Sequence, residues 1–361
     1  MSDDVPPPLH PVEIALMAIG MVGNILCCML MFRNRLMPDK NVNLNAVLNL
    51  LQSLLDFFSN LFYIISLISY PKIKSEALGA FVCRVIRSQA LFWMISTLRA
   101  GVNVVIAILN FIKLLYPFLS TSGNLIGFIG IGLALLFVVS LIQVVPHVST
   151  VSFSPNSTKH NCNFSAILNF QEVTGLVGMV RFFALFNFIY LYIFPLTATM
   201  FLYKQVFNCL KESDDEPRKI AYREIMKSFL MDTVLYLLCF SMHSILFFLY
   251  QFSSKIGYLV TSTLYRIGML LVALYAVLYP YISMATRRAY RKPISDVMKI
   301  FGFKQYNTTI YKQSISKYGH SIDNSGSRFS KFFSSKQKNK PSGNTSKPTS
   351  SVNDWSDNDS F

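Results

Sequence analysis

The stretch YAVLYPYISMATRRAYRKP occupies residues 275–293. Its first half is apolar and aromatic and contains Pro280, whereas basic residues gather in its second half, at 287–292. In a soluble helix an interior proline is disfavoured, because it removes one backbone hydrogen bond and clashes with the preceding turn. A membrane helix tolerates it, since neighbouring helices and waters satisfy the freed carbonyl. Clustered Arg and Lys directly after an apolar run mark the cytoplasmic end of a span, so this stretch predicts the exit of a transmembrane helix.

The composition of the whole chain agrees with a membrane protein. Of its 361 residues, 52% are hydrophobic and 14% are charged, whereas soluble domains carry about 25% charged residues. A large soluble protein with a rich core is the alternative, but the apolar runs are too long for core helices. A bilayer about 30 Å thick needs about 20 apolar residues per span. Seven such runs occur, at 12–32, 46–69, 85–109, 125–146, 182–207, 228–250 and 258–284. The sequence therefore predicts an all-α membrane protein whose seven-helix transmembrane domain occupies residues 12–284.

The positions of Lys and Arg predict the orientation of this bundle. With the N-terminal segment 1–11 outside, more basic residues fall on the inner segments than on the outer ones, even without the C-terminal tail. The cluster at 287–292 weighs most, because it lies closest to a membrane end. The net charge of +15 is then typical of an inner membrane surface rather than of nucleic-acid binding. We therefore expect a multi-pass protein of the plasma membrane.

Two further segments follow the seventh span. In residues 285–301, Tyr290 and Ile294 recur near helical spacing with basic residues between them, which predicts an amphipathic helix on the inner membrane surface. Residues 302–361 are rich in Ser, Lys, Asn and Gly and have few apolar residues. Such a segment buries too little surface to fold, so we predict a disordered cytoplasmic tail.

Two cysteines, Cys83 and Cys162, fall outside the membrane in this topology. An oxidising exterior allows them to pair, which would tie the second outer loop over the bundle; two free thiols are the alternative. The same loop carries glycosylation sequons at Asn156 and Asn163, so we expect both asparagines to be glycosylated.

Local motifs within the spans resemble those of the rhodopsin-like G-protein-coupled receptors. The matching residues are Gly23-Asn24 in the first span, Ile106, Ala107, Ile108 and Pro117 at the end of the third, Pro195 and Tyr203 in the fifth, Cys239-Phe240 in the sixth and Tyr279-Pro280 in the seventh. The resemblance covers about residues 12–301. It implies a receptor that signals to a heterotrimeric G protein.

The departures from that family are also informative. Asn110 stands where the family has the arginine of its Asp-Arg-Tyr motif, Met242 replaces the sixth-helix proline, and Ser283 replaces a seventh-helix tyrosine. Altered motifs within an otherwise matching arrangement of seven spans resemble those of the nematode serpentine chemoreceptor families. The resemblance therefore implies a chemosensory receptor for a small organic ligand, expressed in sensory cells.

The resemblance also implies a ligand pocket at the outer end of the bundle. An apolar, aromatic cavity with a few polar groups suits a small organic molecule, although aromatic residues on these faces also simply pack helices together. The expected lining residues are Phe92, Trp93, Ser96, Asn187, Tyr190, Phe240, His243, Phe247, Tyr265, Arg266 and Met269. Arg266 lies near the rim, where it could receive an acidic ligand group. The seventh span contains no lysine, which excludes a retinal Schiff base and therefore an opsin.

Ionisable residues inside the spans predict polar contacts in the core. A charge at the centre of a span costs about 2.5–3.5 kcal/mol, so we expect Asp56 and Arg99, which the family's register places at similar depth, to form an ion pair. In many relatives a sodium ion occupies this region, and the arginine would take its place. The alternative is that Arg99 extends toward the membrane surface or binds a backbone carbonyl. We also consider Asp232 as a conformational latch with Tyr203 or Asn110, a simple interfacial position being the alternative.

The inner face is expected to contact the G protein. The residues assigned to this face are Asn110, Tyr203, Lys204, Arg223, Lys227 and Arg287. The sequence contains no nucleophile and base at motif spacing, no zinc-type cluster and no glycine-rich phosphate loop, so we expect neither catalysis nor a metal or cofactor. The expected partners are a small-molecule ligand, a heterotrimeric G protein and the lipid bilayer.

Two other functions remain open. A transporter or channel would predict repeated halves or a polar stripe across the membrane, and neither is apparent. A non-signalling member of the receptor fold is kept open by the missing arginine at Asn110.

Overall fold

The computed structural model describes residues 9–35, 44–68, 75–115, 123–149, 151–154, 162–164, 177–212, 216–252, 262–287, 290 and 294. The tail predicted at 302–361 lies outside these ranges. So do residues 1–8 of the N-terminal segment and, apart from a few positions, the surface helix predicted at 285–301.

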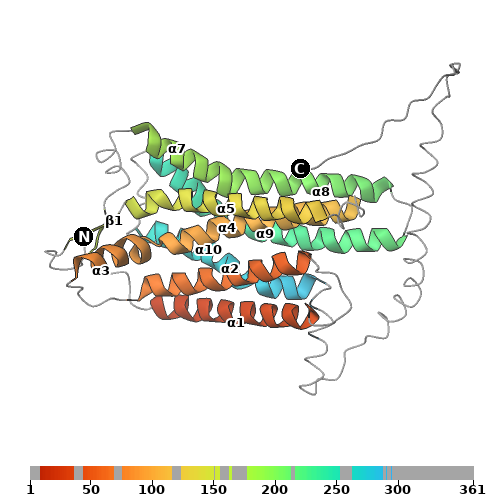
Figure 1. The fold of residues 1–361 in the computed structure, drawn as a ribbon, viewed down its shortest axis with the longest axis horizontal. Helices are drawn as coiled ribbons and strands as arrows, with labels where there is room; N and C mark the ends of the chain where they lie inside the picture. Colours follow the sequence, from red (N-terminus) through yellow and green to blue (C-terminus); the bar gives the residue numbers. More distant parts are fainter. Residues whose placement is uncertain are drawn as a thin grey trace, which may run out of the picture. The chain divides into compact units, whose positions relative to one another are not determined.

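The described chain is almost entirely helical (Figure 1). Five spans are uninterrupted helices: α1 (Leu9–Arg35), α2 (Leu44–Leu67), α5 (Gly123–Ser149), α9 (Glu216–Phe252) and α10 (Thr263–Thr286). The third span consists of α3 (Glu76–Phe81), the π-helical segment η1 (Val82–Arg87) and α4 (Ala90–Leu115). The fifth consists of α7 (Val177–Phe188), the π-helical segment η3 (Ile189–Ile193) and α8 (Phe194–Glu212). Strands β1 (Val151–Phe153) and β2 (Cys162–Phe164) form an antiparallel pair.

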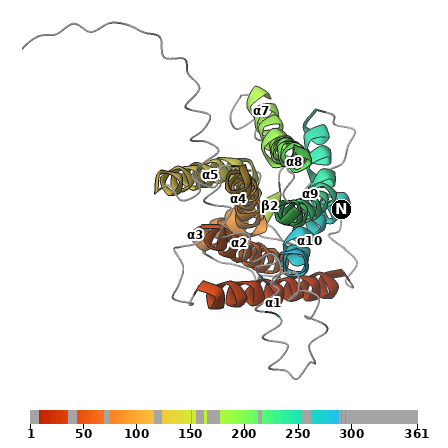
Figure 2. The same cartoon turned by 90° about the vertical axis from the view of Figure 1, so that its right-hand side faces the viewer.

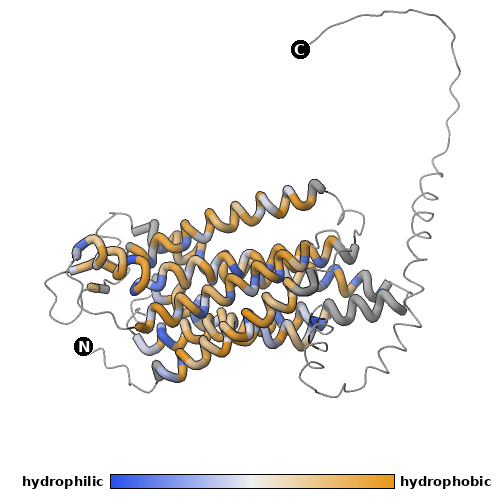
Figure 3. Tube along the Cα trace, turned by 60° about the horizontal axis from the view of Figure 1, so that its bottom comes forward, coloured by the Kyte–Doolittle hydropathy of each residue, from blue (hydrophilic) through white to orange (hydrophobic). Residues whose placement is uncertain are grey.

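Within the described residues, seven helices are long and apolar enough to cross a membrane. Each coincides with one of the seven apolar runs in the sequence, so the predicted number and positions of the spans are confirmed. Apolar residues cover most of the length of these helices, as Figure 3 shows. The chain is therefore a multi-pass membrane protein.

Helices α4 and α10 both have several helical neighbours in the bundle. Helices α2, α5 and α8 contact α4, whereas α10 contacts α9, α1 and α2. Seen end-on, α5 and the α7–α8 segment lie at the periphery of the bundle (Figure 2). Their outward side chains include Phe128, Leu135 and Phe201, which are more than half exposed. Exposed apolar side chains of this kind are typical of helices that face lipid.

Pro280, in the decisive stretch, lies inside α10 and is accommodated by neighbouring helices. Because proline has no backbone N–H, the carbonyl of Ala276, four residues earlier, lacks its usual helical donor. The side-chain amides of Asn24 in α1 and Asn60 in α2 donate to this carbonyl, at 3.0 and 3.5 Å. The proline therefore creates a polar contact that joins three helices.

Pro195, near the start of α8, is accommodated in a similar way. It has no N–H to offer the carbonyl of Leu191, four residues earlier. The hydroxyl of Tyr236 in α9 donates to that carbonyl. This contact fixes α9 against the π-helical segment of the fifth span.

Replacing Gly20 with alanine is expected to loosen the contact between α1 and α10. A Cβ atom at this position would lie 2.7 Å from the amide nitrogen of Asn60 and 2.9 Å from the Cα of Val277, which belongs to the α10 backbone. Overpacking of this kind costs about 1–3 kcal/mol, so the thermal midpoint of the purified protein should fall.

Gly127→Ala is the matched control for this experiment. A Cβ atom at Gly127 meets nothing within 4 Å, and alanine favours a helix more than glycine does. Its midpoint should therefore stay equal or rise slightly. Equal midpoints for Gly20→Ala and the parent chain would contradict the close packing of α1 on α10.

Candidate functional site

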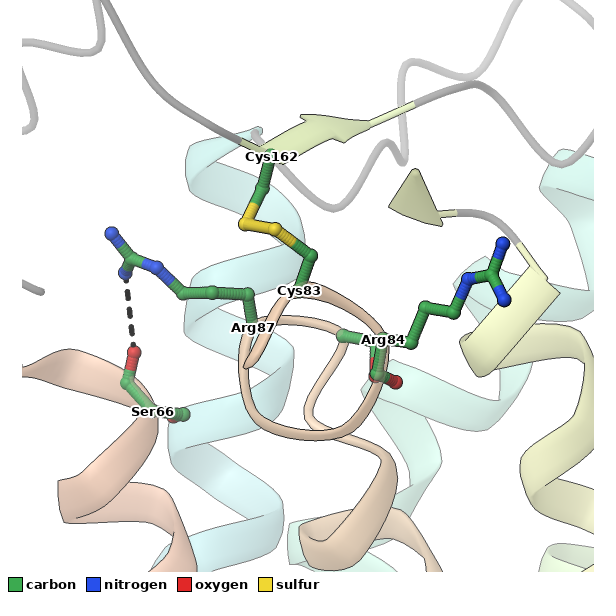
Figure 4. The surroundings of a disulfide bond; sticks show 6 residues. Ser66, Cys83, Arg84, Arg87 and Cys162 are labelled. Carbon is green, nitrogen blue, oxygen red and sulfur yellow. Dashed lines mark hydrogen bonds between the residues drawn. A yellow bond between two sulfur atoms is a disulfide. The ribbon is translucent and has the colours of Figure 1, made fainter. Parts of the chain in front are cut away.

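A disulfide joins Cys83 in η1 to Cys162 in β2 (Figure 4). This agrees with the pairing that the sequence favoured. We refer to this end of the bundle as the disulfide end. The disulfide also anchors the strand pair, because Cys162 pairs with Phe153 of β1. A Cβ atom at Gly79 in α3 would overlap the Phe153 ring, so a glycine there lets the strand pair lie directly on α3.

The third span is interrupted between η1 and α4, at Gln89. This residue has a φ of 59°, in the left-handed region that non-glycine residues rarely adopt. Its side-chain oxygen accepts a hydrogen bond from the Tyr265 hydroxyl at 3.4 Å, and the Trp93 indole donates to the same hydroxyl at 3.1 Å. Backbone strain of this kind occurs at functional sites more often than elsewhere. The strained turn therefore contacts the residues predicted to bind the ligand.

Five ring-bearing residues form what we call the aromatic cluster: Trp93, His147, His243, Phe247 and Tyr265. The Trp93 ring lies 4.0 Å from that of His243 and 5.2 Å from that of His147, measured between centroids. All five side chains are buried. His147, in the last turn of α5, was not predicted from the sequence, because nothing in an apolar run fixes which face of the helix points inward.

The other predicted pocket residues are also buried or half-buried. Phe92, Phe240 and Met269 belong to the same hydrophobic core as the aromatic cluster, and Tyr190 packs against it. The Ser96 hydroxyl lies 3.5 Å from that of Ser59 in α2. The structure thus brings these residues together, but it packs them against one another as a core.

Two predicted polar residues of the pocket have different environments. Asn187 is buried in α7, and its side-chain oxygen has no hydrogen-bond partner among the described residues. Arg266 donates to both carboxylate oxygens of Glu13 in α1, at 3.0 and 2.9 Å. The prediction that Arg266 is available at the rim for an acidic ligand is therefore corrected: a buried glutamate, which the sequence analysis missed, occupies its guanidinium.

Asp56 and Arg99 form an ion pair in the centre of the bundle, as expected from the cost of an isolated charge. The distance from Arg99 Nη1 to Asp56 Oδ1 is 3.0 Å, and both side chains are completely buried. The guanidinium also lies over the rings of Tyr275 and Phe240, 4.6 and 5.4 Å from their centroids. Such cation–π contacts add to the Coulomb attraction when the charge is desolvated. The pair therefore links α2, α4, α9 and α10.

A further ion pair lies at the end of the bundle opposite the disulfide end, which we call the Arg287 end. Arg287 Nη2 lies 2.7 Å from Asp232 Oδ2 in α9 and donates to the Tyr279 hydroxyl, also at 2.7 Å. The same guanidinium donates to Asn49 in α2 and to Ser228 in α9. The predicted partners of Asp232, Tyr203 and Asn110, are therefore wrong. Arg287 follows the seventh span, and hydropathy could not place it against α9.

The remaining residues of the predicted G-protein face are only partly brought together. Asn110 accepts a hydrogen bond from Asn45 in α2, at 2.7 Å. Lys204 and Lys227 are exposed, and Tyr203 is half-buried. Arg287 is tied to Asp232 rather than presented at the surface. The side chain of Arg223 lies outside the described part of the structure, as do Asn156 and the side chain of Asn163.

Tyr275 and Tyr279 connect the Asp56–Arg99 pair to the Asp232–Arg287 pair along α10. Tyr275 lies under the Arg99 guanidinium and accepts a hydrogen bond from Asn103. The ring centroids of the two tyrosines are 5.6 Å apart, and Tyr279 contacts Arg287. The sequence signal was their spacing of four residues, which places both on one face of a helix. The ion pair in the centre of the bundle is thus in continuous contact with the one at the Arg287 end.

Comparison with known proteins identifies no relative: no family model and no curated protein matches the chain. Within the described residues there is also no group of His, Cys, Asp and Glu that could hold a metal ion.

Proposed function

We propose that the chain is a chemosensory G-protein-coupled receptor of the plasma membrane, with its N-terminus and the disulfide end outside. The observation that carries the proposal is the tether between Cys83 and Cys162, which ties the strand pair between the fourth and fifth spans to the start of the third. This architecture, with seven membrane-length helices, is the one that the motif resemblance implies. A small organic molecule would bind beside the aromatic cluster and displace its packed side chains.

The signalling step would be a population shift between two arrangements of the helices. A ligand shifts such an equilibrium only if it binds one state better than the other. The Asp232–Arg287 pair holds α9 against α10 at the Arg287 end, so it would stabilise the inactive state. A G protein would then bind where these helices separate, near the exposed Lys204 and Lys227.

The orientation is tested first with epitope tags on intact cells. A tag after Ser2 should be labelled without permeabilisation, and one after Phe361 only after permeabilisation. The reverse pattern would contradict a receptor that is oriented as proposed. Disulfide mapping on the same cells should recover the Cys83–Cys162 linkage from protein at the surface.

Signalling is tested with a second-messenger reporter and a panel of small organic molecules. A saturable response that is lost when the loop between the fifth and sixth spans is truncated would support the receptor function. Surface expression with no response from any G-protein class would favour a non-signalling member of the fold. Uptake or a current that depends on the chain would favour a transporter or channel.

A further inference from the structure

Two aromatic rings on α10 lie between the ion pair in the centre of the bundle and the one at the Arg287 end. The guanidinium carbon of Arg99 lies 4.6 Å from the centroid of the Tyr275 ring, and that of Arg287 lies 5.3 Å from the centroid of the Tyr279 ring. The two ring centroids are 5.6 Å apart, and both tyrosines are buried. Each arginine therefore packs on one ring, and the two rings pack on each other.

A hydrogen bond also holds each ring at its hydroxyl group. Asn103, one turn after Arg99 in α4, donates to the Tyr275 hydroxyl. Arg287 donates to the Tyr279 hydroxyl at 2.7 Å. A ring that is held by both its face and its hydroxyl group loses one of these contacts when it rotates or shifts. Because protein interiors are close-packed, such a shift is passed on to the neighbouring side chain. The positions of the two rings are therefore interdependent.

Helix α9 contacts this pair of tyrosines at two levels. The Tyr236 ring lies edge-on to that of Tyr275, with centroids 5.7 Å apart. Asp232, one turn earlier in α9, is bound by Arg287, which in turn contacts Tyr279. A separation of α9 from α10 would therefore disturb both tyrosines, and a displaced tyrosine would weaken the contact of α9 with α10.

A second route between the two ion pairs runs along α2. The Gln52 amide donates to Asp56 at 3.4 Å, and Asn49, three residues earlier, accepts a hydrogen bond from Arg287. The Gln52 oxygen is buried and has no hydrogen-bond partner among the described residues, so no bond from it reaches Asn49. The tyrosine rings, in contrast, are in direct contact. The route along α10 is therefore the continuous one.

We propose that Tyr275 and Tyr279 couple the two ion pairs, so that loosening the pair in the centre weakens the pair at the Arg287 end. Arg99 fixes the Tyr275 ring, this ring supports Tyr279, and the Tyr279 hydroxyl orients the Arg287 guanidinium toward Asp232. The coupling itself is independent of the proposed receptor function. Its consequence rests on that function: a ligand that repacks the centre of the bundle would release α9 at the Arg287 end without contacting it.

The test places 3-fluorotyrosine at position 279 of the full-length chain in lipid nanodiscs and follows its fluorine NMR resonance. Two substitutions disturb Tyr275 from α4. Arg99→Lys keeps the charge but removes the planar contact with the ring, and Asn103→Ala removes the hydrogen bond to the hydroxyl without removing a charge. Each should move the resonance in the same direction as Asp232→Asn, which acts on Tyr279 from the Arg287 end.

Repeating both substitutions in a Tyr275→Leu background locates the route. The leucine removes the ring, so Arg99→Lys and Asn103→Ala should leave the resonance where Tyr275→Leu alone places it. Glu13→Gln, at the disulfide end, is the control and should not move the resonance of the parent chain. A resonance that moves with neither substitution in the parent chain would overturn the proposal. So would one that moves equally far without the Tyr275 ring, because the coupling would then run along α2.

The thermal midpoint gives a second measure of the same coupling. Asn103→Ala and Asp232→Asn together should lower the midpoint by about 2 °C less than the sum of their separate effects, and in the Tyr275→Leu background the two effects should add. Signalling is measured separately. Coupled midpoints and resonances without a change in second-messenger output for Asn103→Ala would support the coupling and contradict the proposed receptor function. Additive midpoints together with a fixed resonance would overturn the coupling, whatever the signalling output.

Discussion

Replacement of Asp56 or Arg99 by alanine is expected to remove most of the correctly folded protein from the membrane. Each change leaves one ion with no exposed surface, in the centre of the bundle, without its partner. Breaking a buried pair in this way costs about 3–5 kcal/mol, while whole domains are stable by only about 5–15 kcal/mol. Surface level, together with the monodisperse fraction after detergent extraction, measures the effect.

The two single variants should not be equally severe. Arg99 also donates to the Val272 carbonyl at 3.5 Å and lies over the Tyr275 and Phe240 rings, so Arg99→Ala removes contacts with α9 and α10 as well. Arg99→Lys should recover only part of the loss, because an ammonium group cannot reproduce the planar contact with both rings.

The double variant Asp56→Ala/Arg99→Ala gives the decisive comparison. It removes both charges, so its loss should be smaller than the sum of the two single losses, with a coupling of about 0.5–3 kcal/mol. The control is the same cycle at Glu13 and Arg266, where the arginine is 15% exposed and partial hydration reduces the penalty. Strict additivity at Asp56 and Arg99 would show that their proximity contributes no energy.

The Asp56–Arg99 pair also shows how much of the structure could be predicted from the sequence. Span positions follow from the length of apolar runs, and a charge inside a span requires a compensating group within reach. Asp56 and Arg99 could therefore be paired once both were assigned to similar depth. Cys83 and Cys162 could be paired because both fell outside the membrane in one topology.

The environment of the expected ligand residues could not be predicted in the same way. Hydropathy places Trp93 and His243 inside spans, but the rotation of each helix decides whether their rings enclose a space or pack at 4.0 Å. His147 belongs to the cluster because of the rotation of α5 about its axis. Glu13 contacts Arg266 because α1 packs on α10. These relations depend on side-chain packing between segments far apart in the sequence.

Breaking the Asp232–Arg287 pair is expected to raise signalling in the absence of ligand. In the proposed mechanism the pair exists only while α9 lies against α10, so its energy favours the inactive state. A hydrogen bond to a charged group contributes about 1.5–3 kcal/mol. Because each side chain is 15% exposed, a value near the lower limit applies. Every 1.4 kcal/mol corresponds to tenfold in an equilibrium constant, so Asp232→Asn should raise the ratio of active to inactive protein about tenfold.

Arg287→Gln should have a larger effect than Asp232→Asn. Its guanidinium also contacts Asn49 in α2 and Tyr279 in α10, so its removal also breaks the link from α9 to α2. The double variant should signal like Arg287→Gln alone, because both changes remove the same ion pair. The measurement is second-messenger output per receptor at the cell surface, without added ligand.

Glu13→Gln is the control for this prediction. It removes the acidic partner of an ion pair of similar geometry between α1 and α10 at the disulfide end. It should not raise signalling without ligand. The thermal midpoint separates the two possible roles of the pair at the Arg287 end. A lower midpoint together with higher basal signalling identifies a latch that holds the inactive state. A lower midpoint with unchanged signalling would mean that Asp232 and Arg287 only stabilise the bundle, and that α9 does not move away from α10 when the receptor is active.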